Sequence, residues 1–450
     1  SHTYSFVQQP SQWLVYKIKD PFMYKYVKPA WESGSARGGI LPYLWYTEGI
    51  TPRSRETLPT SKHFEGKGHM VMRSGWDDSG TILIYKAGPN GNHYHYDQGT
   101  ILLTHNGEEL LTDAGHSNDY YGNLYFPGYY TQAIGHNVML VDMNAESQAA
   151  GDFNNGIVSL KNYPKITHSF AGEISDAVES DLTSVYKGAV SSYTRSLIST
   201  KNGPVFLFDK VKSAKEYSFN WIFHAEHTNG KSSITYADKR LTITRPAARL
   251  TMDVLSPEPL TSRIRNSDRE ESFIALSSDK LKDATFLAVM TPEGKSANGE
   301  FTDRSKAVRL DKKGWIGAKL NEQAAVYYGF FKLDDDAENN IEGYATDASR
   351  FTAIIQGGKL AKAYFEGSRF EGYGGKVKFS TPVSAAISIT STGTDLEVKS
   401  ATECKLSVTS SSKPSQVLVN GLPSKNWKFD QKTGMVSVNL AAGQSKLSIK

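Results

Sequence analysis

Short runs of β-branched and aromatic residues dominate the chain from about residue 56 to residue 378, and no sustained helical periodicity interrupts them. The runs lie at 81–86, 100–104, 205–209, 241–245, 286–290, 324–331 and 351–355. Asn-Gly pairs separate many of them, beginning at Asn90, Asn106, Asn155, Asn202, Asn229 and Asn298. Both residues of such a pair tolerate positive φ, which favours tight hairpin turns. The pattern predicts a large antiparallel β-sandwich.

The two ends of the chain follow other patterns. Near the N-terminus, Trp13–Ile18 predicts a short amphipathic helix that stops close to Pro21, and an aromatic segment and a Gly-rich stretch follow. Residues 379–450 are rich in Ser, Thr, Val and Lys, and their short strands predict a smaller, separate β-sandwich. We therefore expect a mostly β fold in three parts: a helical region with a linker (1–55), a central sandwich (56–378) and a C-terminal sandwich (379–450).

Composition narrows the classes of partner and site. The 51 Lys and Arg residues nearly balance the 47 Asp and Glu residues, giving a net charge of +4 over 450 residues. This small charge argues against nucleic acid, whose partners usually carry a dense basic stripe. A single cysteine, Cys404, excludes an internal disulfide framework and a cysteine-based zinc site. No apolar run reaches the ~18 residues that a membrane span needs.

Five of the eleven histidines, His93, His95, His105, His116 and His136, fall between 93 and 136. In an extended chain, residues two apart point the same way, so His93 and His95 would share a face. Two neutral imidazoles on one face are a natural start for a zinc site. Asp113, which follows a predicted strand, is the candidate third ligand, and His136 is a further candidate contact.

The register of the predicted hairpin restricts this site. A two-residue turn at Asn106-Gly107 pairs Glu108 with His105 and places Asp113 opposite Thr100. His95 then lies five residues away along the sheet, so the two side chains meet only if the chain bends near 97–99, which Gly99 permits. The spacing alone leaves a functional and a structural role equally open. A His-x-His-x-Asp string also occurs in metallo-β-lactamase-like hydrolases, but those need a histidine at the place of Gln98 and an α/β setting.

The order of motifs across about fifty residues resembles the heparinase II/III-type polysaccharide lyases. The pieces are His93-Tyr94-His95-Tyr96-Asp97, Asn106-Gly107, Thr112-Asp113-Ala114-Gly115, the Tyr-rich stretch 120–130 and His136-Asn137-Val138-Met139-Leu140-Val141-Asp142. The resemblance implies an N-terminal (α/α) toroid, a central antiparallel β-sandwich and often a C-terminal β-domain. It also implies cleavage of uronic-acid-containing polysaccharides, including heparan sulfate-type glycosaminoglycans and alginate.

Site residues follow from the same resemblance. His93 matches the catalytic histidine of the sandwich, and His95, Asp113 and His136 match three ligands of a structural zinc ion. A tyrosine of the stretch 120–130 would contact the sugar, with Tyr130 preferred and Tyr125 as another candidate. The family's toroid residues have no counterpart here, so we expect a toroid that is missing from this chain, in the same or a separate polypeptide. The start at Ser1 fits a mature or truncated chain, and we expect a periplasmic or secreted bacterial protein.

The implied reaction is β-elimination, in which a base removes the proton on uronate C5 and an acid protonates the departing C4 oxygen. His93 would be the base or a donor near the uronate, and zinc would hold the loop that presents it. Two other hypotheses stay open: a zinc-dependent hydrolase with a metal-bound hydroxide, and a non-catalytic carbohydrate-binding sandwich. A basic stretch could serve the acidic substrate, although a solvated strand face is favoured; it comprises Lys239, Arg240, Arg245, Arg249, Arg263 and Arg265.

Overall fold

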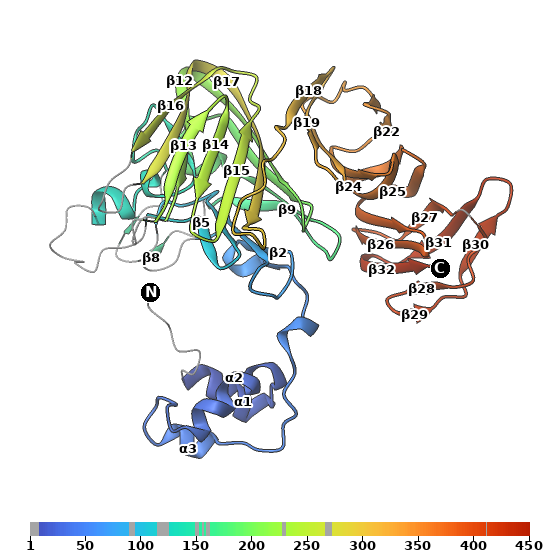
Figure 1. Ribbon diagram of the computed structural model, residues 1–450, viewed down its shortest axis with the longest axis horizontal. Coiled ribbons are helices and arrows are strands. Elements are labelled where there is room, and N and C mark those ends of the chain that lie inside the picture. The colour runs from blue at the N-terminus through green and yellow to red at the C-terminus, as the bar shows by residue number, and fades with distance from the viewer. Residues whose placement is uncertain are drawn as a thin grey trace. The chain divides into compact units, whose positions relative to one another are not determined.

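The computed structural model describes residues 9–89, 95–114, 126–148, 153–154, 157–158, 163–226, 231–265, 272–410 and 412–450 (Figure 1). It divides into two compact units, Ser1–Thr60 and Ser61–Lys450. The fold is mostly β with large antiparallel sheets, which confirms the predicted fold class. The Asn-Gly pairs at Asn90, Asn155 and Asn229 lie outside the described residues.

The first unit is helical, with α1 (Gln9–Ile18), α2 (Pro21–Glu32) and α3 (Leu41–Trp45). Asp20 caps α2 by accepting a hydrogen bond from the backbone N–H of Met23 at 2.7 Å, and Pro21 occupies the first turn, where its missing N–H costs nothing. Val15, Val27 and neighbouring aromatic side chains form a small core. The helix predicted over 13–18 is therefore confirmed. No helix of the described residues is long and apolar enough to cross a membrane.

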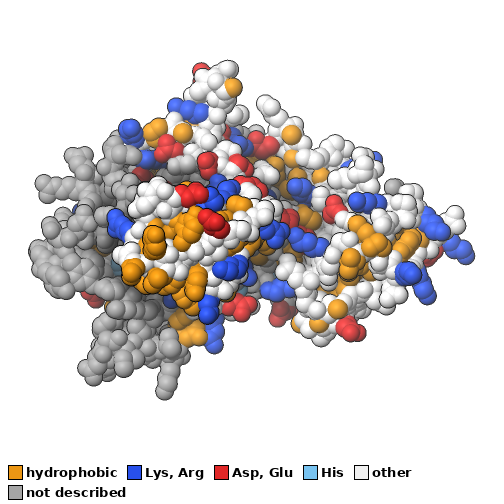
Figure 2. All heavy atoms as spheres, turned by 90° about the horizontal axis from the view of Figure 1, so that it is seen from below, with side chains coloured by type: hydrophobic (Ala, Val, Ile, Leu, Met, Phe, Trp, Pro, Cys, Tyr) orange, Lys and Arg blue, Asp and Glu red, His pale blue; other side chains and the backbone are white. Residues whose placement is uncertain are grey.

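The surface of the helical unit is unusually apolar. Figure 2 shows hydrophobic side chains gathered on it. Most of the exposed large hydrophobic side chains of the described chain belong to this unit: Trp13, Tyr16, Ile18, Tyr26, Ile40, Tyr43, Leu44 and Tyr46. Contiguous exposed apolar surface of this kind usually marks a contact with another protein surface.

The second unit begins with a five-stranded sheet in the order β1-β2-β3-β4-β5. Its strands are β1 (Lys62–Phe64), β2 (His69–Arg73), β3 (Thr81–Lys86), β4 (Ile101–His105) and β5 (Glu108–Leu111). Burial alternates along them: Met70 and Met72 of β2 are buried and their neighbours are partly exposed. One face of this sheet therefore points into a core, as the period of two requires.

A ten-stranded sheet follows, in the order β13-β14-β15-β17-β12-β11-β10-β9, with β16 paired to β17 and β6 paired to β12. Its strands are β6 (Met139–Val141), β9 (Lys165–Ala171), β10 (Asp176–Asp181), β11 (Ser192–Ser199), β12 (Val205–His224), β13 (Ser233–Ala237), β14 (Arg240–Thr244), β15 (Ala248–Val254), β16 (Leu260–Arg265) and β17 (Phe273–Gly294). Between β6 and β9 in the sequence, β7 (Phe153–Asn154) and β8 (Ile157–Val158) form a separate two-stranded sheet. Val205 and Leu207 join the core shared with the first sheet, whereas Phe206 and Phe208 join a core on the other face. Both faces of this sheet are thus covered, which explains why β12 begins as a continuous apolar run.

The rest of the chain forms one fifteen-stranded sheet. Its strands are β18 (Val308–Lys312), β19 (Trp315–Asn321), β20 (Val326–Lys332), β21 (Asn340–Ile341), β22 (Tyr344–Thr346), β23 (Arg350–Gln356), β24 (Lys359–Gly372), β25 (Gly375–Thr390), β26 (Gly393–Ser400), β27 (Cys404–Thr409), β28 (Val417–Val419), β29 (Leu422–Pro423), β30 (Trp427–Asp430), β31 (Met435–Leu440) and β32 (Gly443–Ile449). The boundary drawn at 378/379 falls inside β25. The division into a central and a C-terminal sandwich stays a prediction.

Gly329 of β20 lies where this sheet packs on the ten-stranded sheet. A Cβ atom there would meet ring atoms of Phe206 at 2.4–2.7 Å, and this ring is fully buried. We expect Gly329→Ala to lower the free energy of unfolding by about 1–3 kcal/mol, because an overpacked core must shift. Gly66→Ala is the matched control, since a Cβ atom there meets nothing within 4 Å. Equal urea midpoints for the two variants would contradict the close packing of these sheets.

Candidate functional site

The chain turns sharply between His95 and the start of β4. Gly99 has a φ of +85°, a left-handed conformation that favours glycine, and its N–H donates to the carbonyl of Lys86 at 2.7 Å. The Lys86 ammonium also binds the carboxylate of Asp97 at 2.5 and 2.7 Å. The bend that the hairpin register requires is therefore present, and an ion pair and a backbone bond fix it.

The hairpin itself follows the predicted turn and then departs from it. Asn106 and Gly107 both have positive φ, and His105 pairs with Glu108 as predicted. The register then shifts, so that Leu103 pairs with Leu111. The extra residue is a β-bulge, which bends the strand and re-aims the side chains that follow it.

Asp113 and His136 meet just beyond this hairpin. His136 Nδ1 lies 3.0 Å from Asp113 Oδ1, and the ring centroid of His95 lies 5.2 Å from that of His136. The structure thus brings together three residues that lie up to 41 positions apart in the sequence, from His95 to His136. Among the described residues, no group of three or more His, Cys, Asp or Glu side chains is arranged to hold a metal ion. The metal-ligand role of the three stays a prediction.

The charges of this cluster depend on one another. Burial raises the pKa of Asp113, but the neighbouring His136 outweighs it and leaves the pKa of Asp113 below its ordinary value. Burial lowers the pKa of His136, but the Asp113 carboxylate raises it by more, so the net pKa shift of His136 is upward. The pKa of His95 falls because of burial and the proximity of His136. His136 Nε2 is buried and has no hydrogen-bond partner among the described residues, an arrangement that is costly unless a ligand satisfies the nitrogen.

Asn137 fastens the strands around the cluster. Its side-chain N–H groups donate to the carbonyls of Ile101 at 2.7 Å and Thr112 at 3.0 Å, and its side-chain oxygen accepts from the N–H of His224 at 2.7 Å. The His224 ring in turn contacts the Tyr129 hydroxyl, with 3.1 Å between Nε2 and Oη. One fully buried amide therefore joins β4, the end of β5 and β12 directly beside His136.

A buried ion pair, Arg195–Asp209, binds the same segments. Arg195 donates from Nη1 to the carbonyls of Gly99 at 2.6 Å and Asn137 at 3.0 Å. Its Nε and Nη2 bind the Asp209 carboxylate, which also accepts from Trp221 Nε1 at 2.7 Å. Both partners are almost completely buried. Arg195 thus holds the bend after His95 and the segment after His136 with a single guanidinium group.

Sequence reasoning did not single out Arg195 and Asp209, although a signal exists. Val205, Leu207 and Asp209 alternate along β12, and the first two join the core. A charged residue that continues an inward-facing apolar alternation is expected to be paired, because an isolated buried charge is too costly. Arg195 stands in the same way on β11, between buried residues two positions on either side.

The remaining predicted residues fall in different places. His93 and Tyr125 lie outside the described residues. Tyr130 is fully buried in a cluster with Tyr129 and Val138, and its hydroxyl has no hydrogen-bond partner among the described residues. Its contact with a sugar stays a prediction.

In the basic stretch, three arginines form ion pairs. Arg240 binds Asp253, Arg245 binds Glu108 and Arg249 binds Glu293. The solvated strand face that the sequence favours is found only at Lys239, Arg263 and Arg265, which are exposed, whereas Arg245 is buried.

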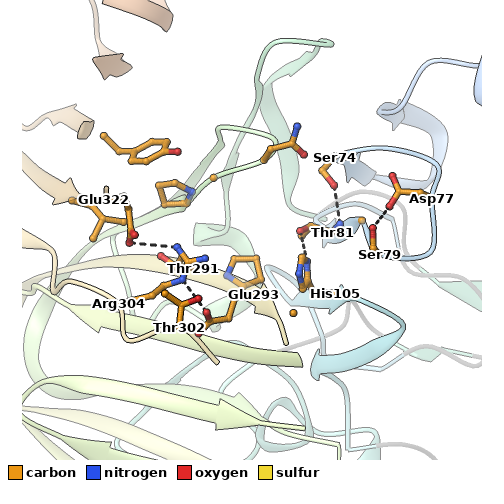
Figure 3. Close-up of a pocket in the computed structure, with 18 residues that line it drawn as sticks. Ser74, Asp77, Ser79, Thr81, His105, Thr291, Glu293, Thr302, Arg304 and Glu322 are labelled. Atoms are coloured by element: carbon orange, nitrogen blue, oxygen red, sulfur yellow. Dashed lines mark hydrogen bonds and ion pairs between the residues drawn. The ribbon is translucent and has the colours of Figure 1, made fainter. Parts of the chain in front are cut away.

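Figure 3 shows a separate polar cavity of about 370 Å³, at the end of β4 that lies away from the cluster. His105, the last residue of β4, contacts Thr81 with 2.9 Å between Nδ1 and Oγ1. Arg304 donates from Nε to Glu293 at 3.2 Å, and its Nη1 lies 3.4 Å from Glu322. The cationic group of this cavity is already neutralised by the two carboxylates, so we assign no substrate role to it.

Comparison with known proteins identifies the family of this chain. The sequence matches the family described as "Heparinase II/III-like, C-terminal" over residues 56–300, more than half of the chain. The chain therefore belongs to this family, as the ordered motifs indicate. No curated protein matches the sequence.

Solved structures of similar fold include a heparinase III, with 15% identity and a TM-score of 0.51 over 74% of this chain and 49% of that one. Heparan sulfate lyase HepC from Pedobacter heparinus has 17% identity and a TM-score of 0.47, covering 65% of this chain and 45% of that one. A chondroitin AC lyase from Streptomyces coelicolor A3 has 9% identity and a TM-score of 0.46, covering 91% and 52%. The chain spans about half the length of these proteins.

Proposed function

We propose that this chain is the β-sandwich part of a polysaccharide lyase that cleaves a uronic-acid-containing polysaccharide by β-elimination. The observation that carries the proposal is the convergence of His95, Asp113 and His136 at one end of the β4–β5 hairpin, within the segment that matches the family. The substrate class covers heparan sulfate-type glycosaminoglycans and alginate.

In the proposed reaction, His93 acts close to uronate C5. The proton on uronate C5 is weakly acidic because C5 is bonded to the carbon of a carboxylate. Hydrogen bonds that neutralise this carboxylate stabilise the negative charge that develops as the proton leaves. His93 takes the proton as base or donates to the uronate, and an acid protonates the departing C4 oxygen. No water is added, and the product carries a C4=C5 double bond. The fixed bend at Gly99 and the Lys86–Asp97 ion pair anchor one end of the segment that carries His93.

We also propose that His95, Asp113 and His136 hold a structural zinc ion. Imidazole and carboxylate are typical zinc ligands. The buried Nε2 of His136, which has no hydrogen-bond partner in the described part of the chain, would gain one in such an ion. Zinc bound there would cross-link the segments on either side of the hairpin and so organise the loop that presents His93. Its ligands would be oriented by neighbouring hydrogen bonds, of which the Asn137 network is the nearest.

The groups that act on the other side of the sugar are proposed to come from a helical toroid N-terminal to this sandwich, in the same or a separate chain. The apolar surface of the helical unit supports this, because side chains such as Tyr43, which is 88% exposed, suit packing against further helices. A periplasmic or secreted location agrees with a polymeric extracellular substrate.

The proposal is tested by incubating the protein with heparan sulfate, alginate and other uronate polymers, alone and together with the N-terminal toroid. The ultraviolet absorbance of unsaturated uronate ends is the readout. We expect an increase with at least one polymer, and a loss of about 10²–10⁴-fold in His93→Ala, the usual contribution of a general acid or base. His105→Ala, at the other end of β4, is the matched control and should keep the activity.

Each alternative has its own outcome in this assay. Saturated products and loss of activity with a chelator would replace the lyase with a zinc-dependent hydrolase. Glycan binding that survives His93→Ala, without turnover by the complete protein, would leave a carbohydrate-binding sandwich.

A further inference from the structure

A second cavity, of about 490 Å³, lies beside the segment that leads to His93. Its walls come from β1 and the turn that follows it, from residues 87–89 after β3, from residues 163–169 at the start of β9, and from Lys399 of β26. The charged and titratable side chains among its lining residues are His63, Glu65, Tyr163, Lys165, His168 and Lys399. The cavity therefore has two ammonium groups and one carboxylate.

Neither ammonium group forms an ion pair within the described part of the chain. Lys399 Nζ donates to the carbonyl of Ser169 at 2.8 Å, which orients it but leaves its charge uncompensated. Lys165 Nζ lies 5.9 Å from the ring centroid of Tyr163. Among the described residues, no carboxylate pairs with either lysine. This distinguishes the cavity from the one in Figure 3, whose arginine is held by two carboxylates.

The two histidines add neutral hydrogen-bonding groups. Burial lowers the pKa of His63 and of His168. His63 contacts Ser169, with 3.0 Å between Nδ1 and Oγ, and His168 Nε2 lies 3.0 Å from the Tyr364 hydroxyl. Each ring is therefore fixed through one nitrogen, so the cavity presents imidazole edges as well as ammonium groups.

A hydrogen bond links the lining of the cavity to the segment of His95. Gly88 lines the cavity, and its N–H donates to the side-chain oxygen of Gln98 at 2.9 Å, three residues after His95. A Cβ atom on Gly88 would lie 2.6 Å from the Cα of Gly68, another lining residue, so two backbones pack directly against each other. Gly88 thus connects the lining of the cavity to the segment that follows His95.

We propose that this cavity binds a carboxylate or sulfate group of a sugar that flanks the cleaved bond. The inference rests on the proposed function for the identity of the polymer. For the charge of the group it rests on Lys165 and Lys399, which pair with no carboxylate that the structure describes. Two ammonium groups against the single carboxylate of Glu65 give the lining a net positive charge, which favours an anion. Hydrogen bonds to a charged group are stronger than those between neutral groups. The pocket would thus fix the register of the polysaccharide relative to His93.

The test compares the double variant Lys165→Gln/Lys399→Gln with the wild type in the full-length protein. Binding of unsulfated uronate oligosaccharides and of heparan sulfate oligosaccharides is measured by calorimetry at fixed salt. We expect the dissociation constant to rise about tenfold or more, equivalent to one lost charge-assisted contact. A loss confined to the sulfated ligands identifies sulfate as the bound group, and a loss with both identifies the carboxylate.

Lys425→Gln/Lys428→Gln removes the same charge from an exposed part of the C-terminal strands and is the matched control. Lys165→Arg/Lys399→Arg keeps the charge and should restore most of the affinity. An equal loss in the Lys425/Lys428 control would show that net charge alone is responsible, and unchanged affinity in the pocket variant would overturn the proposal.

Turnover separates this inference from the proposed function. If unsaturated ends form and the pocket variant leaves KM unchanged, the lyase stands and the subsite fails. If the pocket variant loses affinity but the complete protein never forms unsaturated ends, the subsite stands and the lyase fails.

Discussion

Asp209→Asn is expected to lower the free energy of unfolding by about 3–5 kcal/mol, the usual cost of removing one partner from a buried ion pair. Asp209 is fully buried and accepts hydrogen bonds from Arg195, Tyr193 and Trp221. Without the carboxylate, the charge of Arg195 stays in the core with no counter-charge. The urea midpoint, followed by tryptophan fluorescence and by circular dichroism, measures the loss.

The effect should reach the candidate site, because Arg195 also binds the carbonyls of Gly99 and Asn137. We expect faster hydrogen exchange at the N–H groups of the bend after His95 than in the wild type. Asp311→Asn is the matched control, since Asp311 is 53% exposed and pairs with Arg309 on the surface. Its cost should stay within about 1 kcal/mol, the range of exposed pairs. Comparable losses in the two variants would contradict the anchoring role of the buried pair.

Local rules predicted the fold wherever one residue type suits one backbone conformation. The Asn106-Gly107 turn forms with both φ angles positive, and His105 pairs with Glu108 as the turn length requires. The extent of the long strands was harder to predict. β12 runs from Val205 to His224, far beyond its apolar start, because the ladder to β17 continues through exposed residues with two register shifts. Backbone hydrogen bonds do not require apolar side chains, so hydrophobic runs underestimate such strands.

In the candidate site, too, the locally determined features could be predicted and the tertiary partners could not. Residue types and order indicated His95, Asp113 and His136, and Gly99 indicated the bend that lets them meet. The bulge that breaks the register before Leu111 has no residue type that marks it in the sequence. The contact by which Arg195 holds the bend joins it to Gly99, 96 positions earlier in the chain. Such tertiary partners have no local signature beyond a charged residue at an inward-facing position of a strand.

Zinc is expected to stabilise the wild-type protein and to be lost together with any one of its ligands. Metal analysis of the purified protein should find about one ion per chain, as the ligand set implies. Because binding to the folded state alone adds to its stability, free zinc at about 1,000 times its dissociation constant should raise the free energy of unfolding by about 4 kcal/mol. Calorimetric melting with and without a chelator measures this increment.

The increment, and not the absolute stability, is the decisive quantity for the ligand variants. His136 is fully buried, so His136→Ala leaves a cavity and destabilises the protein with or without a metal. If His136 is a ligand, the melting temperature of this variant should no longer respond to zinc or to the chelator, and Asp113→Asn should behave in the same way. His105→Ala, which alters a partly buried histidine at the far end of β4, should keep both the ion and the full increment. A His136→Ala protein that still binds one zinc ion and still gains stability from it would remove His136 from the ligand set. The free energy of metal binding would then not depend on His136 Nε2, the only buried imidazole nitrogen without a partner among the described residues.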